Sequence, residues 1–114
     1  MDNLKNMADS LNDLAAQVHA TAREKGWYEE NRSVLEHAAL IHSEVSELVE
    51  EYRSNGLSHM LASGKPVGIE SELADIIIRT LDCSMALGVN IGHAVMLKMR
   101  YNATRSYRHG GKRA

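Results

Sequence analysis

The sequence is poor in cysteine and in long apolar runs, and each shortage excludes a class of protein. Its one cysteine, Cys83, cannot form an internal disulfide, which argues against a disulfide-rich scaffold and indicates a packed thiol in a reducing compartment. No apolar stretch approaches the ~20 residues that a membrane-spanning helix needs. The first ten residues carry acids and no continuous apolar segment, so no signal peptide is expected. We therefore expect a cytoplasmic protein with no membrane partner.

Acidic residues are also missing from the C-terminal part of the chain, because all 15 lie before Cys83. The last 32 residues carry six of the 13 lysines and arginines and no acid, a charge of +6 against −8 for the rest. This asymmetry indicates an anionic ligand at one region and a cation at another. With 114 residues, 44% of them hydrophobic, the chain is expected to be one domain, residues 1–114, with a basic tail from about residue 106. So short a domain favours homo-oligomerisation when a large site must be enclosed.

Apolar spacing and end signals predict an all-α fold of four helices. The predicted helices span residues 4–25, about 33–53, about 69–87, and 90 to 99 or a little beyond. Ser33-x-x-Glu36 has the form of a capping box, and Asn90 is a typical N-cap. Residues 55–68 contain three glycines and the only proline, so we expect a connecting loop there, long enough to act as a mobile lid. No segment has a convincing strand pattern.

Two acidic pairs with one spacing, Glu44-x-x-Glu47 and Glu72-x-x-Asp75, occupy the same angular position on the second and third predicted helices. Each pair lies beside the apolar arc that its helix is expected to bury, and neither pair points into that arc. The earlier arc contains Val34, Ala38, Ile41, Val45, Leu48, Val49 and Tyr52, and the later one contains Ile69, Leu73, Ile76, Ile77, Thr80, Ser84 and Leu87. If the two helices pack antiparallel, the acidic stripes either converge on one groove or both diverge.

Convergence would gather four carboxylates, which repel one another unless a cation offsets their charge. Hard oxygen ligands favour magnesium, with manganese as the alternative. A di-iron site normally adds Glu-x-x-His pairs, and no histidine here follows a glutamate by three residues. The competing interpretation, that both pairs are solvated helix surface, is weakened by their matching phase.

A basic constellation follows on the fourth predicted helix, where Lys98, Asn102 and Arg105 share one face at i, i+4 and i+7. Lysine and arginine are the usual pair for holding a polyphosphate. Cations that complement the dipole of a helix C-terminus are the alternative. Carboxylates that bind a metal and basic side chains that bind phosphate are together the two parts of a metal–nucleotide site.

The order Glu-x-x-Glu, Glu-x-x-Asp, Lys-x-x-x-Asn resembles the MazG-like, all-α nucleoside triphosphate pyrophosphohydrolases over about residues 26 to 112. The tail His109-Gly110-Gly111-Lys112 resembles the ending of small single-domain members. The resemblance implies a four-helix, MazG-like bundle completed by homo-oligomerisation, a homodimer or dimer of dimers. It also implies magnesium-dependent hydrolysis of a (d)NTP to its monophosphate and pyrophosphate, serving to remove noncanonical nucleotides or to limit a dNTP pool. In such a protein Glu44, Glu47, Glu72 and Asp75 would be metal ligands, with Lys98 and Asn102 near the substrate.

One departure concerns the base that activates water, because many members carry a second glutamate where this chain has Ser43. Glu47 and Glu51, both on the acidic stripe, are the candidates. Trp27 is the only tryptophan, and it either stacks on a nucleobase or closes one end of the bundle. His37 and His42 are predicted to be helix-surface residues.

Three alternatives stay open at this stage. The chain is a pyrophosphohydrolase of another phosphorylated metabolite, such as phosphoribosyl-ATP; or it is a noncatalytic dimeric helical module; or its basic tail binds nucleic acid. We expect no stable nucleic-acid partner.

Overall fold

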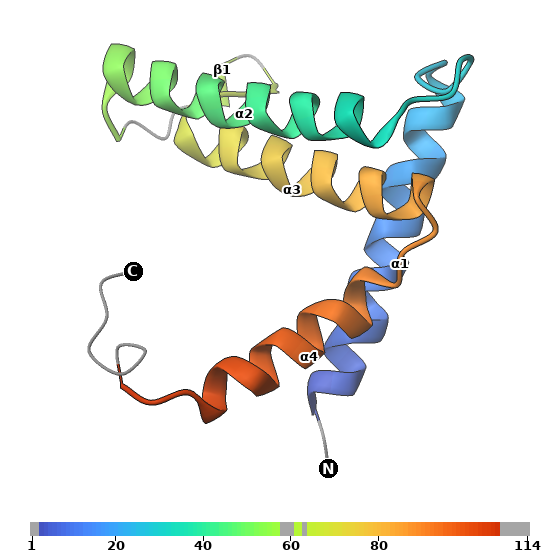
Figure 1. Cartoon of the computed structure of the whole chain (residues 1–114). Helices are drawn as coiled ribbons and strands as arrows, with labels where there is room; N and C mark the ends of the chain where they lie inside the picture. Colours follow the sequence, from blue (N-terminus) through green and yellow to red (C-terminus); the bar gives the residue numbers. More distant parts are fainter. Residues whose placement is uncertain (1–2, 58–60, 63, 108–114) are drawn as a thin grey trace.

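The structure, a computed structural model, describes residues 3–57, 61, 62 and 64–107, and within them it is almost entirely helical (Figure 1). The four helices are α1 (Asn3–Glu24), α2 (Val34–Asn55), α3 (Ile69–Ala86) and α4 (Ile91–Thr104). The all-α prediction and the four helices are confirmed. The predicted ends lie within a few residues of the observed ones, except that α4 continues well past residue 99.

Local signals account for these ends. The Ser33 hydroxyl accepts a hydrogen bond from the Glu36 N–H and the Glu36 carboxylate accepts one from the Ser33 N–H, both at 3.1 Å. This capping box satisfies two donors that the first turn of α2 leaves unpaired. Asn90 Oδ1 accepts the His93 N–H at 3.0 Å and so starts α4. Gly88 follows α3 with φ +70°, a conformation that glycine adopts without steric cost.

The connection between α2 and α3 contains an antiparallel hairpin that the sequence did not predict. Strands β1 (Leu61–Ala62) and β2 (Lys65–Pro66) pair Leu61 with Pro66 and Ala62 with Lys65. Two-residue strands are too short to show alternation, so periodicity could not reveal them. Residues 58–60 and 63 of the predicted lid lie outside the described part of the chain, and lid motion stays a prediction.

The helices form an open arrangement in which α2 packs along α3, α1 crosses α3, and α4 packs on α1 (Figure 1). The chain bends by 115° between α3 and α4, which directs α4 away from the α2–α3 pair. In the described residues no single helix has the length and apolar character to cross a membrane; α3 and α4 meet those criteria only as this bent pair.

The crossing of α1 and α4 depends on a glycine. A Cβ added at Gly92 would lie 2.1 Å from the Ala8 carbonyl oxygen, so no side chain fits there. Asn12 Oδ1 accepts the Gly92 N–H at 2.8 Å, and Asn12 Nδ2 donates to Asn90 Oδ1 at 2.9 Å. Asn12 therefore joins α1 to the N-terminus of α4.

The apolar core within one chain is small. Among the described residues the buried apolar side chains are only Ala8, Ala15 and Leu81. The accessible surface is 8752 Å², against about 6,200 Å² expected for a folded monomer of this mass. The radius of gyration is 16.7 Å, against about 13 Å for a compact domain of this length. The chain therefore exposes far more surface than a self-sufficient domain does.

The prediction that the two apolar arcs are buried is wrong for the single chain. Several arc residues are at least 40% exposed, namely Val34, Val45, Val49 and Tyr52 on α2, Leu73 and Ile77 on α3, and Leu87 just after α3. The polar stripe of each helix instead turns toward the other helix. Hydrophobic periodicity identifies which face of a helix is apolar, but it does not say whether another helix of the same chain covers that face.

Candidate functional site

The two acidic stripes converge along the joint between α2 and α3. Burial raises the pKa of Glu72, and the negative charges of Glu47, Asp75, Glu44 and Glu51 raise it further, in that order. These five carboxylates, the acidic cluster, therefore share one electrostatic neighbourhood. Of the two packings that the sequence left open, the structure has the convergent one.

Within the acidic cluster, burial differs from residue to residue. Glu44 is only 8% exposed, which corrects the prediction that neither pair points inward. Glu72 and Asp75 are half-buried and Glu47 is exposed. The Oε2 atom of Glu72 is enclosed and has no hydrogen-bond partner among the described residues. A buried carboxylate oxygen without a donor is costly, so this atom is poised for a cation or a ligand donor.

The donor chemistry of the cluster fits magnesium, which takes oxygen ligands and uses few carboxylates beside substrate phosphates. In the described ranges no three His, Cys, Asp or Glu groups stand close enough together to hold a metal ion. Glu44, Glu47 and Asp75 nevertheless lie near enough to Glu72 for their negative charges to raise its pKa. The predicted ligands thus share one location, and their ligation stays a prediction.

Glu51 has a structural task that separates it from Glu47. One of its oxygens accepts the Gly68 N–H at 3.0 Å, immediately before α3, and the other accepts a hydrogen bond from the Asn55 amide. Glu51 therefore fastens the end of α2 to the start of α3. No hydrogen bond or ion pair of Glu47 occurs among the described residues. Of the two predicted bases, Glu47 is the one left available to accept a proton.

The basic constellation lies elsewhere in the single chain. Lys98 and Asn102 are exposed on α4, and Arg105 is the first residue beyond its end. The Lys98 and Arg105 cations lie 5.7 Å and 5.8 Å from the centre of the Tyr101 ring. Because α4 packs on α1 and diverges from α2 and α3, one chain does not bring these groups to the acidic cluster. Residues 109–112 of the predicted tail motif lie outside the described residues.

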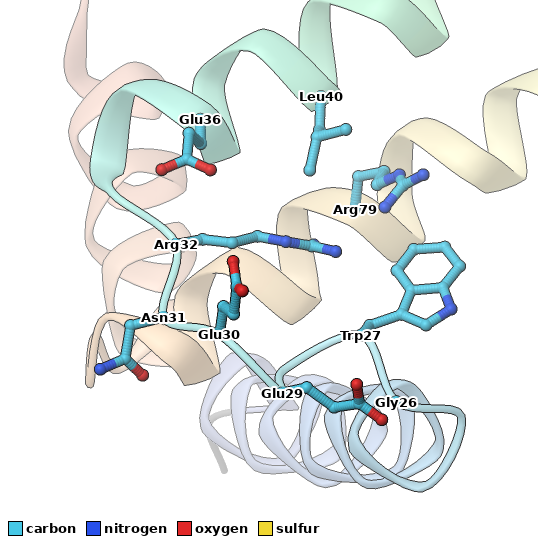
Figure 2. Close-up of a pocket in the computed structure, with 9 residues that line it drawn as sticks. All are labelled: Gly26, Trp27, Glu29, Glu30, Asn31, Arg32, Glu36, Leu40 and Arg79. Atoms are coloured by element: carbon cyan, nitrogen blue, oxygen red, sulfur yellow. The ribbon is translucent and has the colours of Figure 1, made fainter.

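A pocket of about 780 Å³ opens where α1, the following loop, α2 and α3 meet, and we name it the Trp27 pocket (Figure 2). Its lining residues are Gly26, Trp27, Glu29, Glu30, Asn31, Arg32, Glu36, Leu40 and Arg79. Trp27 is 43% exposed, and the Arg79 guanidinium lies over its ring at 4.3 Å. The Arg32 guanidinium lies 5.5 Å from the same ring. The Trp27 ring therefore faces a cavity as well as the bundle.

Arg79 connects this pocket with the acidic cluster. Its Nε lies 3.6 Å from Glu44 Oε2, while its Nη1, like that of Arg32, is enclosed without an acceptor in the described residues. Sequence reasoning missed both arginines. Arg79 follows Glu72 by seven residues, which places it on the same helix face, so the spacing alone could have indicated it. Arg32 lies in a loop and gave no comparable signal.

A polar network joins His19 and Tyr28 to the buried carboxylate of Asp82. The Tyr28 hydroxyl donates to one oxygen of Asp82 at 2.5 Å, and His19 Nδ1 lies 2.7 Å from the other, so that nitrogen must carry a proton. Asp82 is only 4% exposed. Burial and then the bond to Asp82 raise the pKa of Tyr28 beyond the usual tyrosine range, which keeps it a neutral donor.

His37 corrects another prediction, because it is 3% exposed rather than a surface residue. Its ring lies 6.1 Å from that of Tyr28, and its Nε2 has no partner among the described residues. His42 is exposed, as predicted. Cys83 is partly covered, and burial raises the pKa of its thiol, as expected for a packed thiol.

Comparison of the chain with family models, with curated proteins and with solved structures finds no match.

Proposed function

We propose that this chain is a magnesium-dependent nucleoside triphosphate pyrophosphohydrolase that converts a (d)NTP to its monophosphate and pyrophosphate. The observation that carries the proposal is the environment of Glu72. Its pKa is raised by burial and by four neighbouring carboxylates, and its Oε2 has no partner in the described residues. Such a concentration of negative charge costs stability unless it serves a cation. The resemblance in motif order points to the same chemistry.

In this proposal Glu44, Glu72 and Asp75 hold magnesium, which supplies electrostatic stabilisation of the charge that builds up on the leaving pyrophosphate. Glu47, an exposed member of the acidic cluster that is unpaired among the described residues, accepts the proton of the attacking water. Glu51 keeps α2 and α3 in register through Gly68 and acts as a positioning residue.

The active form is a homodimer or dimer of dimers. A helix of one copy covers the exposed apolar arcs of another, which accounts for the surplus accessible surface. Since α4 diverges from the acidic cluster of its own chain, Lys98, Asn102 and Arg105 reach the phosphates only if a second copy supplies them. The site is then shared between copies.

The test is pyrophosphate release from a panel of canonical and modified NTPs and dNTPs, with and without magnesium. Glu72→Gln keeps the shape of the side chain and removes its charge. We expect the rate of pyrophosphate release to fall at least about a hundredfold, which exceeds the effect of changing a residue that only supports a metal ligand. Glu50→Gln is the matched control, because Glu50 is exposed on α2 and pairs with Arg53 at 3.5 Å. Equal loss in both variants, or release without magnesium, would contradict the proposal.

Hydrolysis of another phosphorylated metabolite is the second enzymatic candidate, and a noncatalytic helical module is the third. The exposed apolar arcs also fit the module. Binding of magnesium to the folded wild-type protein, lost in Glu72→Gln, favours either enzyme. A silent nucleotide panel from protein that binds magnesium would then point to a different phosphorylated substrate.

A further inference from the structure

The Trp27 pocket has a composition that the chemistry of the acidic cluster does not require. Two guanidiniums and an indole lie on one side, and Figure 2 shows the Glu30 carboxylate turned toward Arg32. The Nη1 atoms of Arg32 and Arg79 are enclosed and lack acceptors among the described residues. Unsatisfied buried donors are costly, so a ligand that brings acceptors gains binding energy here.

The pocket also lies at the correct place for the base of a nucleotide whose phosphates reach the acidic cluster. Arg79 contacts Trp27 in the pocket and Glu44 in the cluster. Leu40, in the pocket wall, precedes Glu47 by seven residues, which is about 10 Å along a helix. A nucleotide lying along α2 therefore spans both regions.

The nucleobases differ in how they match this lining. Guanine presents two adjacent acceptors, O6 and N7, which a guanidinium fork contacts in bidentate fashion. Its neighbouring edge presents N1–H and the N2 amino group, which need an acceptor such as a carboxylate. Adenine places a donor beside N7, and the pyrimidines lack N7 altogether. A lining that offers both arginine donors and a carboxylate acceptor fits guanine best.

We propose that the Trp27 pocket binds a guanine base, so that the preferred substrate of the hydrolase is dGTP or GTP; this inference rests on the proposed function. The base stacks on the exposed Trp27 indole. Arg32 and Arg79 donate to O6 and N7, and the Glu30 carboxylate accepts from N1–H and the N2 amino group. Arg79 and Arg32 are then the specificity-determining residues.

Binding can be measured without hydrolysis by titrating the protein with α,β-imido deoxynucleotides in magnesium and following the fluorescence of Trp27, the only tryptophan. We expect the guanine analogue to bind at least about tenfold more tightly than the adenine, cytosine and thymine analogues. The 7-deaza-guanine analogue loses N7, and we expect it to bind about tenfold more weakly than guanine.

Variants separate recognition from folding. Arg79→Lys and Arg32→Lys keep the charge but remove the fork, so we expect each to reduce the guanine preference about tenfold. Arg53→Lys, at an exposed arginine outside the pocket, is the matched control and keeps the preference. Unchanged preference in both pocket variants would overturn the assignment, and circular dichroism checks that they fold.

The outcomes also distinguish this inference from the proposed function. Magnesium-dependent hydrolysis with no guanine preference, or with a preference for another base, overturns the inference and leaves the hydrolase intact. Tight, guanine-selective binding of the imido analogue without hydrolysis of any natural nucleotide supports the pocket and contradicts the hydrolase.

Discussion

Arg79 Nε lies 3.6 Å from Glu44 Oε2 between α3 and α2, and their side chains are 20% and 10% exposed. This ion pair is the only cationic contact of the acidic cluster within the described residues. It links the Trp27 pocket to the predicted metal ligands, because the same guanidinium lies over the Trp27 ring. Removal of either partner leaves a largely buried charge uncompensated.

We expect Arg79→Gln to lower the free energy of unfolding by about 2 kcal/mol, below the range for a fully buried pair because the atoms are partly exposed. Magnesium should restore part of the loss, since a cation at Glu44 replaces the lost charge. Urea unfolding with and without magnesium measures both effects. Arg53→Gln, which breaks an exposed pair with Glu50, should cost less than about 0.5 kcal/mol. If magnesium restores nothing, Glu44 is not a metal ligand.

Glu72 makes stability depend on pH in a known direction. Its pKa is raised in the folded state, so between the unfolded and folded pKa values the folded protein binds more protons. Stability from this group is therefore present below the unfolded pKa of about 4.3 and is lost as the pH rises through the folded pKa. Glu72→Gln should melt at a higher temperature than wild type at pH 7 without magnesium, and the difference should shrink toward pH 4.

Thermal melts across that pH range, in chelator, test the prediction for Glu72. Addition of magnesium should raise the melting temperature of the wild type above that of Glu72→Gln at pH 7, because only the wild type binds the ion. A variant that melts below wild type at pH 7 in chelator would contradict the repulsion inferred for the cluster.

The Tyr28–Asp82 bond should contribute measurably to folding. Tyr28→Phe removes a hydrogen bond to a carboxylate that is 4% exposed, so we expect a loss of about 2 kcal/mol in the free energy of unfolding. Tyr52→Phe is the control, because Tyr52 is 57% exposed, and we expect it to change stability by less than about 0.5 kcal/mol. Chemical denaturation measures the free energy of unfolding of both variants. Equal losses in the two variants would show that the bond from Tyr28 to Asp82 adds no stability of its own.

Exposed apolar arcs predict association. Ile77 on α3 is 54% exposed, and we expect Ile77→Lys to weaken self-association by placing a charge in the covered face. Sedimentation velocity should show a dimer or tetramer for wild type and smaller species for the variant. Leu57→Lys, outside both arcs and 68% exposed, should leave the oligomer unchanged. A wild-type protein that remains monomeric at high concentration would contradict both the shared site and the bundle completed by a second copy.

The positions of helix ends were predictable because their signals are local. Ser33 and Glu36 lie within one turn, and their hydrogen bonds need no partner from elsewhere in the chain. The acidic pairs were predictable for the same reason, since a three-residue spacing places two side chains on one helix face. Arg32 was not predictable in this way, because it lies in a loop that has no periodic pattern. The network around Asp82 depends on a bond from Tyr28, 54 positions away in the chain, which no local pattern encodes.

By itself, the sequence determined four helices, their caps, an apolar and an acidic face on α2 and α3, and the separation of acidic from basic charge. Only the tertiary structure decided that the acidic faces meet each other while much of both apolar arcs stays exposed, that His37 is buried, and that Arg79 joins Trp27 to Glu44. The physical reason is that periodicity sets the direction of side chains around one helix axis. The choice of neighbour depends on the total energy of packing several helices together.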